Sequence, residues 1–81
     1  MNKREIINEI LEERDITSLT ADGFDDAIIG LCGERVVYDE RRCIEILAED
    51  MGSVEEALDY FGYNVEGSYV GEHTPLYVEV V

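Results

Sequence analysis

The second half of this chain lacks positive charge. Residues 43–81 contain nine carboxylates and no lysine or arginine, and Lys3 is the only lysine in the whole sequence. Nucleic-acid binding through phosphate contacts needs clustered cations, and a P-loop needs a lysine after its glycine-rich turn. These absences exclude a nucleic-acid surface in the second half and a P-loop nucleotide hydrolase or kinase. The charge favours a partner protein with a basic surface, or a divalent cation.

Long apolar runs are also lacking. No stretch approaches the roughly 18 apolar residues that a membrane helix needs. No basic leader followed by an apolar segment stands at the start of the sequence. We therefore expect a cytoplasmic protein that does not enter a membrane.

Metal-binding and nucleophilic side chains are scarce. Cys32 and Cys43 lie in apolar contexts, where thiols usually pack as small hydrophobic groups. A zinc site needs about four nitrogen or sulfur ligands, and these cysteines with His73, the single histidine, have no CxxC or HxxxH spacing. No cofactor is predicted, and no motif identifies a catalytic site.

The apolar content is high enough for one folded domain. The 81 residues are 46% hydrophobic and carry a net charge of −14, and a chain of this length buries a single core. Repulsion between the carboxylates reduces an already small margin of stability. We expect the stability to rise with salt or with a bound partner.

Apolar periodicity and capping residues predict the element order αββααβ. Apolar residues recur at helical spacing after Asn2, Asp39 and Ser53, and β-branched residues on both sides of Gly33 predict a hairpin. The economical arrangement is an α+β fold, a small antiparallel three-stranded sheet with packed helices. The expected elements are a helix over 3–14, a second helix between the N-cap Asp39 and Gly52, a third helix between the N-cap Ser53 and the C-terminal cap Gly67, and strands over 27–32, 35–38 and 76–81. The apolar face of the third helix consists of Val54, Ala57, Leu58, Phe61 and Val65. Residues 1–81 form a single domain, with the amphipathic helix in 1–16 and an α+β core over 22–81.

Several short stretches between residues 22 and 75 have a distinctive order and spacing. They read DGFDDAIIG at 22–30, VYD at 37–39, CIEIL at 43–47, EEALDYF at 55–61, NVEGSYVG at 64–71 and TP at 74–75. In this order they resemble a group of small tailed-bacteriophage proteins, over about two-thirds of the chain, while residues 1–19 do not match. The resemblance implies a phage origin. It carries over no functional residues, because the group has no assigned activity.

Seven carboxylates fall on the outward faces of the second and third predicted helices if the apolar stripes point inward. Such a face either only keeps the protein soluble or binds a basic site on another protein, such as a nucleic-acid-binding cleft. Both interpretations stay open. The candidate partner-binding residues are Glu45, Glu49, Asp50, Glu55, Glu56, Asp59 and Glu66.

A weaker candidate for a metal site precedes the first strand. Asp22, Asp25 and Asp26 supply several carboxylates on one loop, as hard cations require. Their spacing does not match the calcium-loop pattern, and the preferred interpretation is a turn at Asp22-Gly23 with Asp25 and Asp26 exposed to solvent where the strand begins. Glu72 and His73 would complete such a site, although a simple exposed loop is the preferred interpretation.

The N-terminal helix must place its apolar stripe against another apolar surface. Ile6, Ile7, Ile10 and Leu11 form this stripe. The surface belongs either to this chain or to a second copy. The stripe is therefore a candidate oligomer interface.

These features favour a small acidic accessory protein that acts by protein–protein binding in the cytoplasm, which is the host cytoplasm for a phage-encoded chain. Inhibition of a host nucleic-acid-handling or defence protein is the specific hypothesis. Two alternatives stay open. One is a small ligand- or metal-binding protein or an enzyme, with its site at the Asp22–Asp26 loop, and the other is a self-associating structural or regulatory protein.

Overall fold

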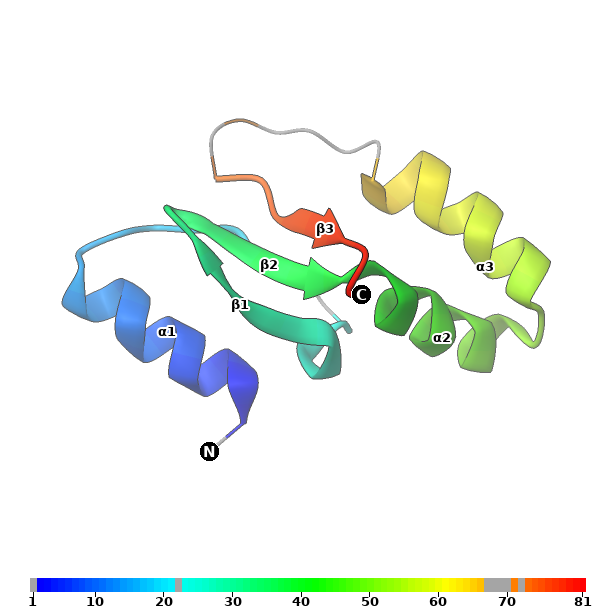
Figure 1. Ribbon diagram of the computed structural model, residues 1–81, viewed down its shortest axis with the longest axis horizontal. Helices are drawn as coiled ribbons and strands as arrows, with labels where there is room; N and C mark the ends of the chain where they lie inside the picture. The colour runs from blue at the N-terminus through cyan, green and yellow to red at the C-terminus, as the bar shows by residue number, and fades with distance from the viewer. Residues whose placement is uncertain (1, 22, 67–70, 72) are drawn as a thin grey trace.

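Three strands of the computed structural model form one sheet in the order β1-β2-β3. Figure 1 shows α1 beside β1, and α2 and α3 beyond the end of β2. The structure describes residues 2–21, 23–66, 71 and 73–81. The predicted α+β class and the order αββααβ are confirmed. The elements are α1 (Lys3–Glu13), η1 (Asp25–Ala27), β1 (Ile28–Cys32), β2 (Arg35–Asp39), α2 (Glu40–Met51), α3 (Val54–Tyr60), η2 (Phe61–Glu66) and β3 (Leu76–Val78).

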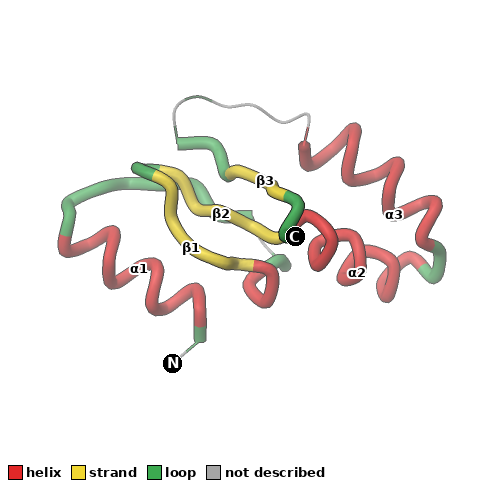
Figure 2. The backbone as a smooth tube through the Cα atoms, viewed as in Figure 1, coloured by secondary structure: helices red, strands yellow, loops and turns green. Residues whose placement is uncertain are grey.

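The sheet is mixed, which corrects the prediction of an antiparallel sheet. β1 and β2 are antiparallel, as predicted, whereas β3 runs parallel to β2, with Tyr38 paired to Tyr77. The cause is the connection between β2 and β3. Figure 2 shows α2 leading the chain away from the end of β2 and α3 leading it back. Such a helical crossover lets β3 run in the same direction as β2.

Local caps set the helix boundaries. Asn2 Oδ1 accepts a hydrogen bond from the Glu5 N–H at 2.9 Å, and Ser53 Oγ accepts one from the Glu56 N–H at 3.3 Å. Gly52 ends α2 in the left-handed conformation, with φ 74°, which favours glycine. Because only Gly52 and Ser53 separate α2 from α3, the two helices form a hairpin and contact each other.

The third predicted helix is split. It was expected over residues 53–67, but α3 ends at Tyr60 and the next six residues form the π-helical segment η2. The predicted C-terminal cap, Gly67, lies outside the described residues. Phe61, the first residue of η2, is buried and packs edge-on against Tyr77, with ring centroids 5.1 Å apart. The split therefore occurs where the chain contributes a large ring to the core.

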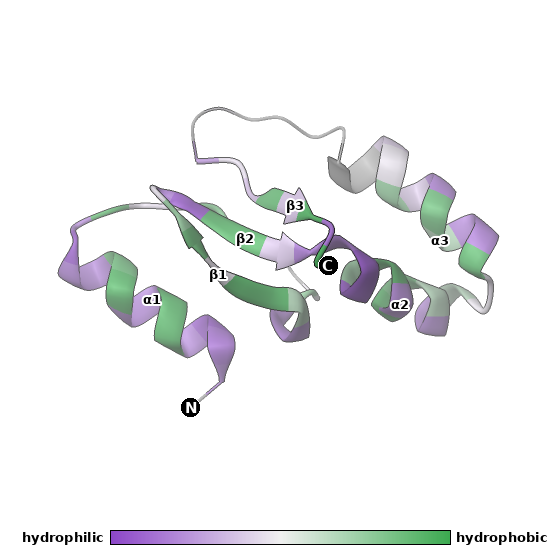
Figure 3. Ribbon diagram, in the orientation of Figure 1, coloured by the Kyte–Doolittle hydropathy of each residue, from purple (hydrophilic) through white to green (hydrophobic). Residues whose placement is uncertain are grey.

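The core joins α1 to the sheet. Ile7 and Leu11 are buried in one cluster with Ile28, Val36 and other residues of the sheet and loops. Figure 3 shows hydrophobic residues along β1 and β2 and alternating hydrophobic and hydrophilic residues in α1. The inner part of the N-terminal stripe therefore lies against this chain.

The helices are short. α2, the longest in the described part of the chain, has 12 residues, which corresponds to about 18 Å. None of the described helices has both the length and the apolar character needed to cross a membrane.

Candidate functional site: an acid-rimmed groove

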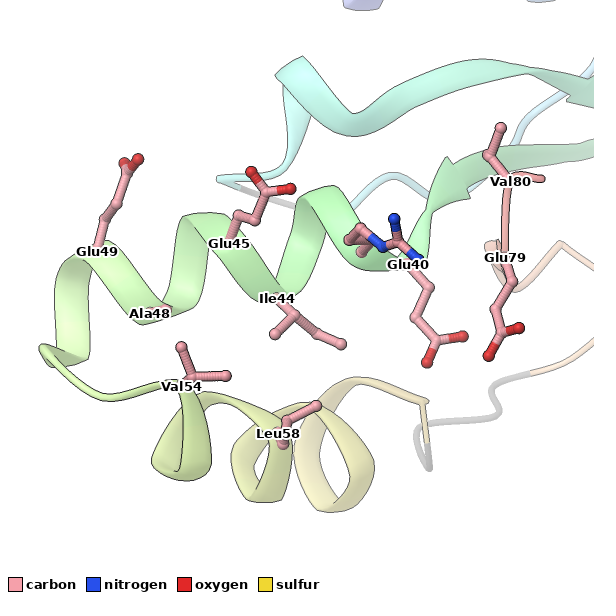
Figure 4. A pocket seen from close by; sticks show the side chains of 10 residues that line it. Glu40, Ile44, Glu45, Ala48, Glu49, Val54, Leu58, Glu79 and Val80 are labelled. Carbon is pink, nitrogen blue, oxygen red and sulfur yellow. The ribbon is translucent and has the colours of Figure 1, made fainter.

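An apolar groove of about 780 Å³ runs between α2 and α3 and reaches the residues after β3. Its apolar lining consists of Ile44 and Ala48 from α2, Val54 and Leu58 from α3, and Val80. In Figure 4, Ile44 points toward α3, while Val54 and Leu58 point toward α2. Two helices therefore present one apolar strip to solvent.

Carboxylates lie along one side and at one end of this strip. Glu45 and Glu49 extend from the side of α2 that faces away from α3, and Glu40 and Glu79 lie together at the other end of the groove (Figure 4). Arg41 is the single cationic residue among the described residues that line it. The rim is therefore negative, and it combines side chains from α2 with one that follows β3.

Two of the seven predicted partner-binding residues, Glu45 and Glu49, line the groove. Glu45 is partly compensated, because its Oε2 lies 3.6 Å from Arg42 Nη1. Four others are exposed but do not line the groove, and Glu66 has a side chain outside the described part of the structure. The four exposed residues are Asp50, Glu55, Glu56 and Asp59.

The apolar part of the groove was missed because Val54 and Leu58 were expected to face the core. They are 60% and 50% exposed, whereas Ala57 and Phe61 are buried. Each pair has i,i+4 spacing, so the two pairs form adjacent stripes along α3 and the first residue of η2. The signal in the sequence is an apolar arc on α3 that is wider than one contact surface requires.

The aspartate loop is only partly described, since Asp22 lies outside the described residues. Asp25 Oδ1 lies 3.5 Å from Arg4 Nη1, and Asp26 is exposed in η1. Within the described residues, no group of three histidine, cysteine or carboxylate side chains could hold a metal ion. Asp25 therefore has an intramolecular cationic neighbour, and the metal site stays a prediction.

His73 and Cys43 do not form a nucleophile and base pair. His73 Nε2 lies 3.6 Å from Glu34 Oε2, and the His73 side chain is partly exposed, while Glu72 lies outside the described residues. Cys43 is fully buried. Burial raises the pKa of the Cys43 thiol to about 12, with smaller contributions from the carboxylates of Asp39 and Glu40. The Cys43 thiol is therefore protonated at neutral pH and packs as a core residue.

The predicted oligomer stripe divides into two parts. Ile7 and Leu11 are buried in this chain, whereas Ile6 is 44% exposed. Ile6 and Ile10 line a second, smaller groove together with Ile29 of β1. Self-association through this outer part stays a prediction.

The groove between α2 and α3 thus combines two of the candidate acidic residues with exposed apolar side chains. An apolar strip with a negative rim suits a ligand that has both an apolar surface and positive charge. No protein-family model, curated protein or solved structure matches the chain.

Proposed function

We propose that this chain is an accessory protein that acts by binding another protein at the groove between α2 and α3. The observation that carries the proposal is the exposure of Val54 and Leu58 beside the groove's glutamates. A surface that only keeps a protein soluble needs charge and no apolar strip. An apolar patch with a polar rim is typical of a protein-binding surface.

The charge of the rim specifies the chemistry of the partner. Glu40, Glu49 and Glu79 contribute negative charge around the strip, and the whole chain carries a net charge of −14. Opposite potentials steer two proteins together and disfavour partners of the same sign. The partner therefore has a basic surface with apolar side chains at its centre.

A protein with such a surface is often one that handles nucleic acid, because phosphate binding uses the same clustered cations. Occupying that surface would block access of nucleic acid and inhibit the partner. The resemblance of residues 22–75 to small tailed-phage proteins supports a host protein as the target.

The test is affinity capture from host lysate at low and high salt with three forms of the protein. They are the wild type, a rim variant carrying Glu49→Lys and Glu79→Lys, and a control variant carrying Glu55→Lys and Glu56→Lys. Both variants change the net charge equally, and all four side chains are exposed. Only the rim variant alters residues that line the groove.

We expect a partner that the wild type and the control variant retain at low salt and that the rim variant loses. High salt should weaken its retention. Equal loss in both variants would mean that capture depends on net charge alone. Equal retention by all three forms would overturn the groove as the binding surface.

A further inference from the structure

The apolar strip has the dimensions of a helix contact. α2 contributes Ile44 and Ala48, and α3 contributes Val54 and Leu58, so each wall presents a pair of residues one helical turn apart. α2 extends over about 18 Å, which corresponds to about three turns of a third helix. A helix lying in the groove between two neighbouring helices packs its ridge of side chains against both.

The walls of the groove favour a helix over an extended peptide. Peptides that bind as strands gain affinity from main-chain hydrogen bonds to a sheet edge. Inside α2 and α3, the backbone N–H and C=O groups bond to one another. A ligand helix satisfies its own backbone and needs from the groove only apolar contact and charge.

The carboxylates determine which helix fits. Glu45 and Glu49 lie along one side of the strip, and Glu40 and Glu79 lie at one end (Figure 4). Lysine and arginine side chains on the flanks of an apolar stripe are long enough to reach such a rim while their stems cover apolar surface. Acidic helices would meet repulsion at the same positions.

We propose that the groove binds an amphipathic helix of the partner protein, with apolar residues at i, i+4 and i+7 and with lysine or arginine on the flank beside α2 and at the end that meets Glu40 and Glu79. This proposal rests on the proposed function and specifies the class of partner segment. The apolar residues of the helix insert between α2 and α3. Its cations contact the glutamates of the rim.

The test uses two fluorescein-labelled peptides with the same composition of leucine, lysine and alanine. One places its leucines at i, i+4 and i+7, and the other has the same residues in an order that breaks the stripe. Anisotropy titrations measure the dissociation constant of each peptide for the wild type, Leu58→Gln and Leu19→Gln. Leu19 is the matched control, because it is an exposed leucine that does not line the groove. Thermal melts of the three proteins verify folding.

We expect the amphipathic peptide to bind the wild type at least about tenfold more tightly than the reordered peptide. Because the two peptides carry the same charge, charge alone would not explain this difference. Leu58→Gln should weaken the amphipathic peptide by about tenfold, while Leu19→Gln leaves it unchanged. Circular dichroism should show the peptide becoming helical on binding. Equal affinity of the two peptides, or equal effects of the two substitutions, would overturn the proposal.

Failure of this proposal can be told apart from failure of the proposed function. If a captured partner depends on the rim but the two peptides bind alike, the protein-binding function stands and the helical ligand is wrong. Analytical ultracentrifugation of the wild type and of Leu58→Gln tests whether a second copy of this chain occupies the groove. A dimer that becomes monomeric on Leu58→Gln would assign the groove to a second copy and overturn the proposal.

Discussion

Tyr38 of β2 and Tyr77 of β3 are paired across the parallel strands, and their rings stack with centroids 5.5 Å apart. The Tyr77 ring also meets Phe61 edge-on. These three aromatic residues connect the sheet to the segment that follows α3. Glu79 directly follows β3, so the position of β3 in the sheet places Glu79 beside α2 at the groove.

Tyr38→Phe tests the polar end of this aromatic group. The Tyr38 hydroxyl accepts a 2.8 Å hydrogen bond from the Ala21 N–H, and the Tyr38 side chain is fully buried. The substitution leaves that N–H without its partner and should lower the free energy of unfolding by about 1–3 kcal/mol. Urea denaturation measures it. Tyr60→Phe, at an exposed tyrosine, is the control and should change the value by less than about 0.5 kcal/mol.

The buried thiol of Cys43 should make the protein less stable at alkaline pH. In the folded protein, burial raises the pKa of its thiol from 9.0 to about 12. The unfolded chain therefore releases this proton first, so the contribution is complete below pH 9 and is lost progressively between pH 9 and about pH 12. Burial also raises the pKa of Tyr77 to about 12 from 10.0. Urea midpoints measured over this range should fall.

The Cys43→Ala variant distinguishes the contribution of the thiol to this alkaline loss of stability from that of the tyrosines. The variant should be less stable at neutral pH, because it loses buried volume. Between pH 9 and pH 10, the free energy of unfolding of the variant should fall less steeply than that of the wild type. In this range the unfolded chain already releases the Cys43 proton, whose pKa there is 9.0, whereas the tyrosine pKa is 10.0. Parallel curves for the wild type and the variant would show that the thiol does not cause the loss.

Substitutions of Leu58 in α3 and of Phe61 at the start of η2 should differ sharply in their effect on stability. Leu58→Gln removes an apolar side chain that is half exposed, so the free energy of unfolding should change by less than about 0.5 kcal/mol. Phe61→Ala empties a buried site and should cost about 3–5 kcal/mol. Thermal and urea unfolding of both variants measure the difference. A large loss in Leu58→Gln would mean that Leu58 supports the fold rather than the binding surface.

Asp25→Asn distinguishes an ion pair from a metal ligand. Asp25 lies 3.5 Å from Arg4, and both side chains are partly exposed, so the substitution should lower the free energy of unfolding by about 0.2–1 kcal/mol. Millimolar Ca²⁺ or Mg²⁺ should shift the melting temperature equally in the wild type and the variant. A cation-dependent rise that only the wild type shows would instead support the metal-binding alternative.

Part of the candidate site was predictable because it is local. Glu45 and Glu49 share the outward side of one helix, and helical periodicity places such residues from their spacing alone. Glu79 lies 30 or more positions further along the chain, and no local pattern relates it to α2. The inward assignment of Val54 and Leu58 was wrong because periodicity identifies an apolar stripe but not how much of it a neighbouring element covers.

The sequence by itself determined the element order, the caps at Asn2 and Ser53 and the turn at Gly52, because these depend on contacts within a few residues. It also determined the excess of negative charge over residues 43–81. The tertiary structure decided that β3 pairs parallel to β2 and that α2 and α3 keep an open groove between them. Both features depend on how a long crossover returns the chain to the sheet, a choice made by the packing of side chains distant in sequence.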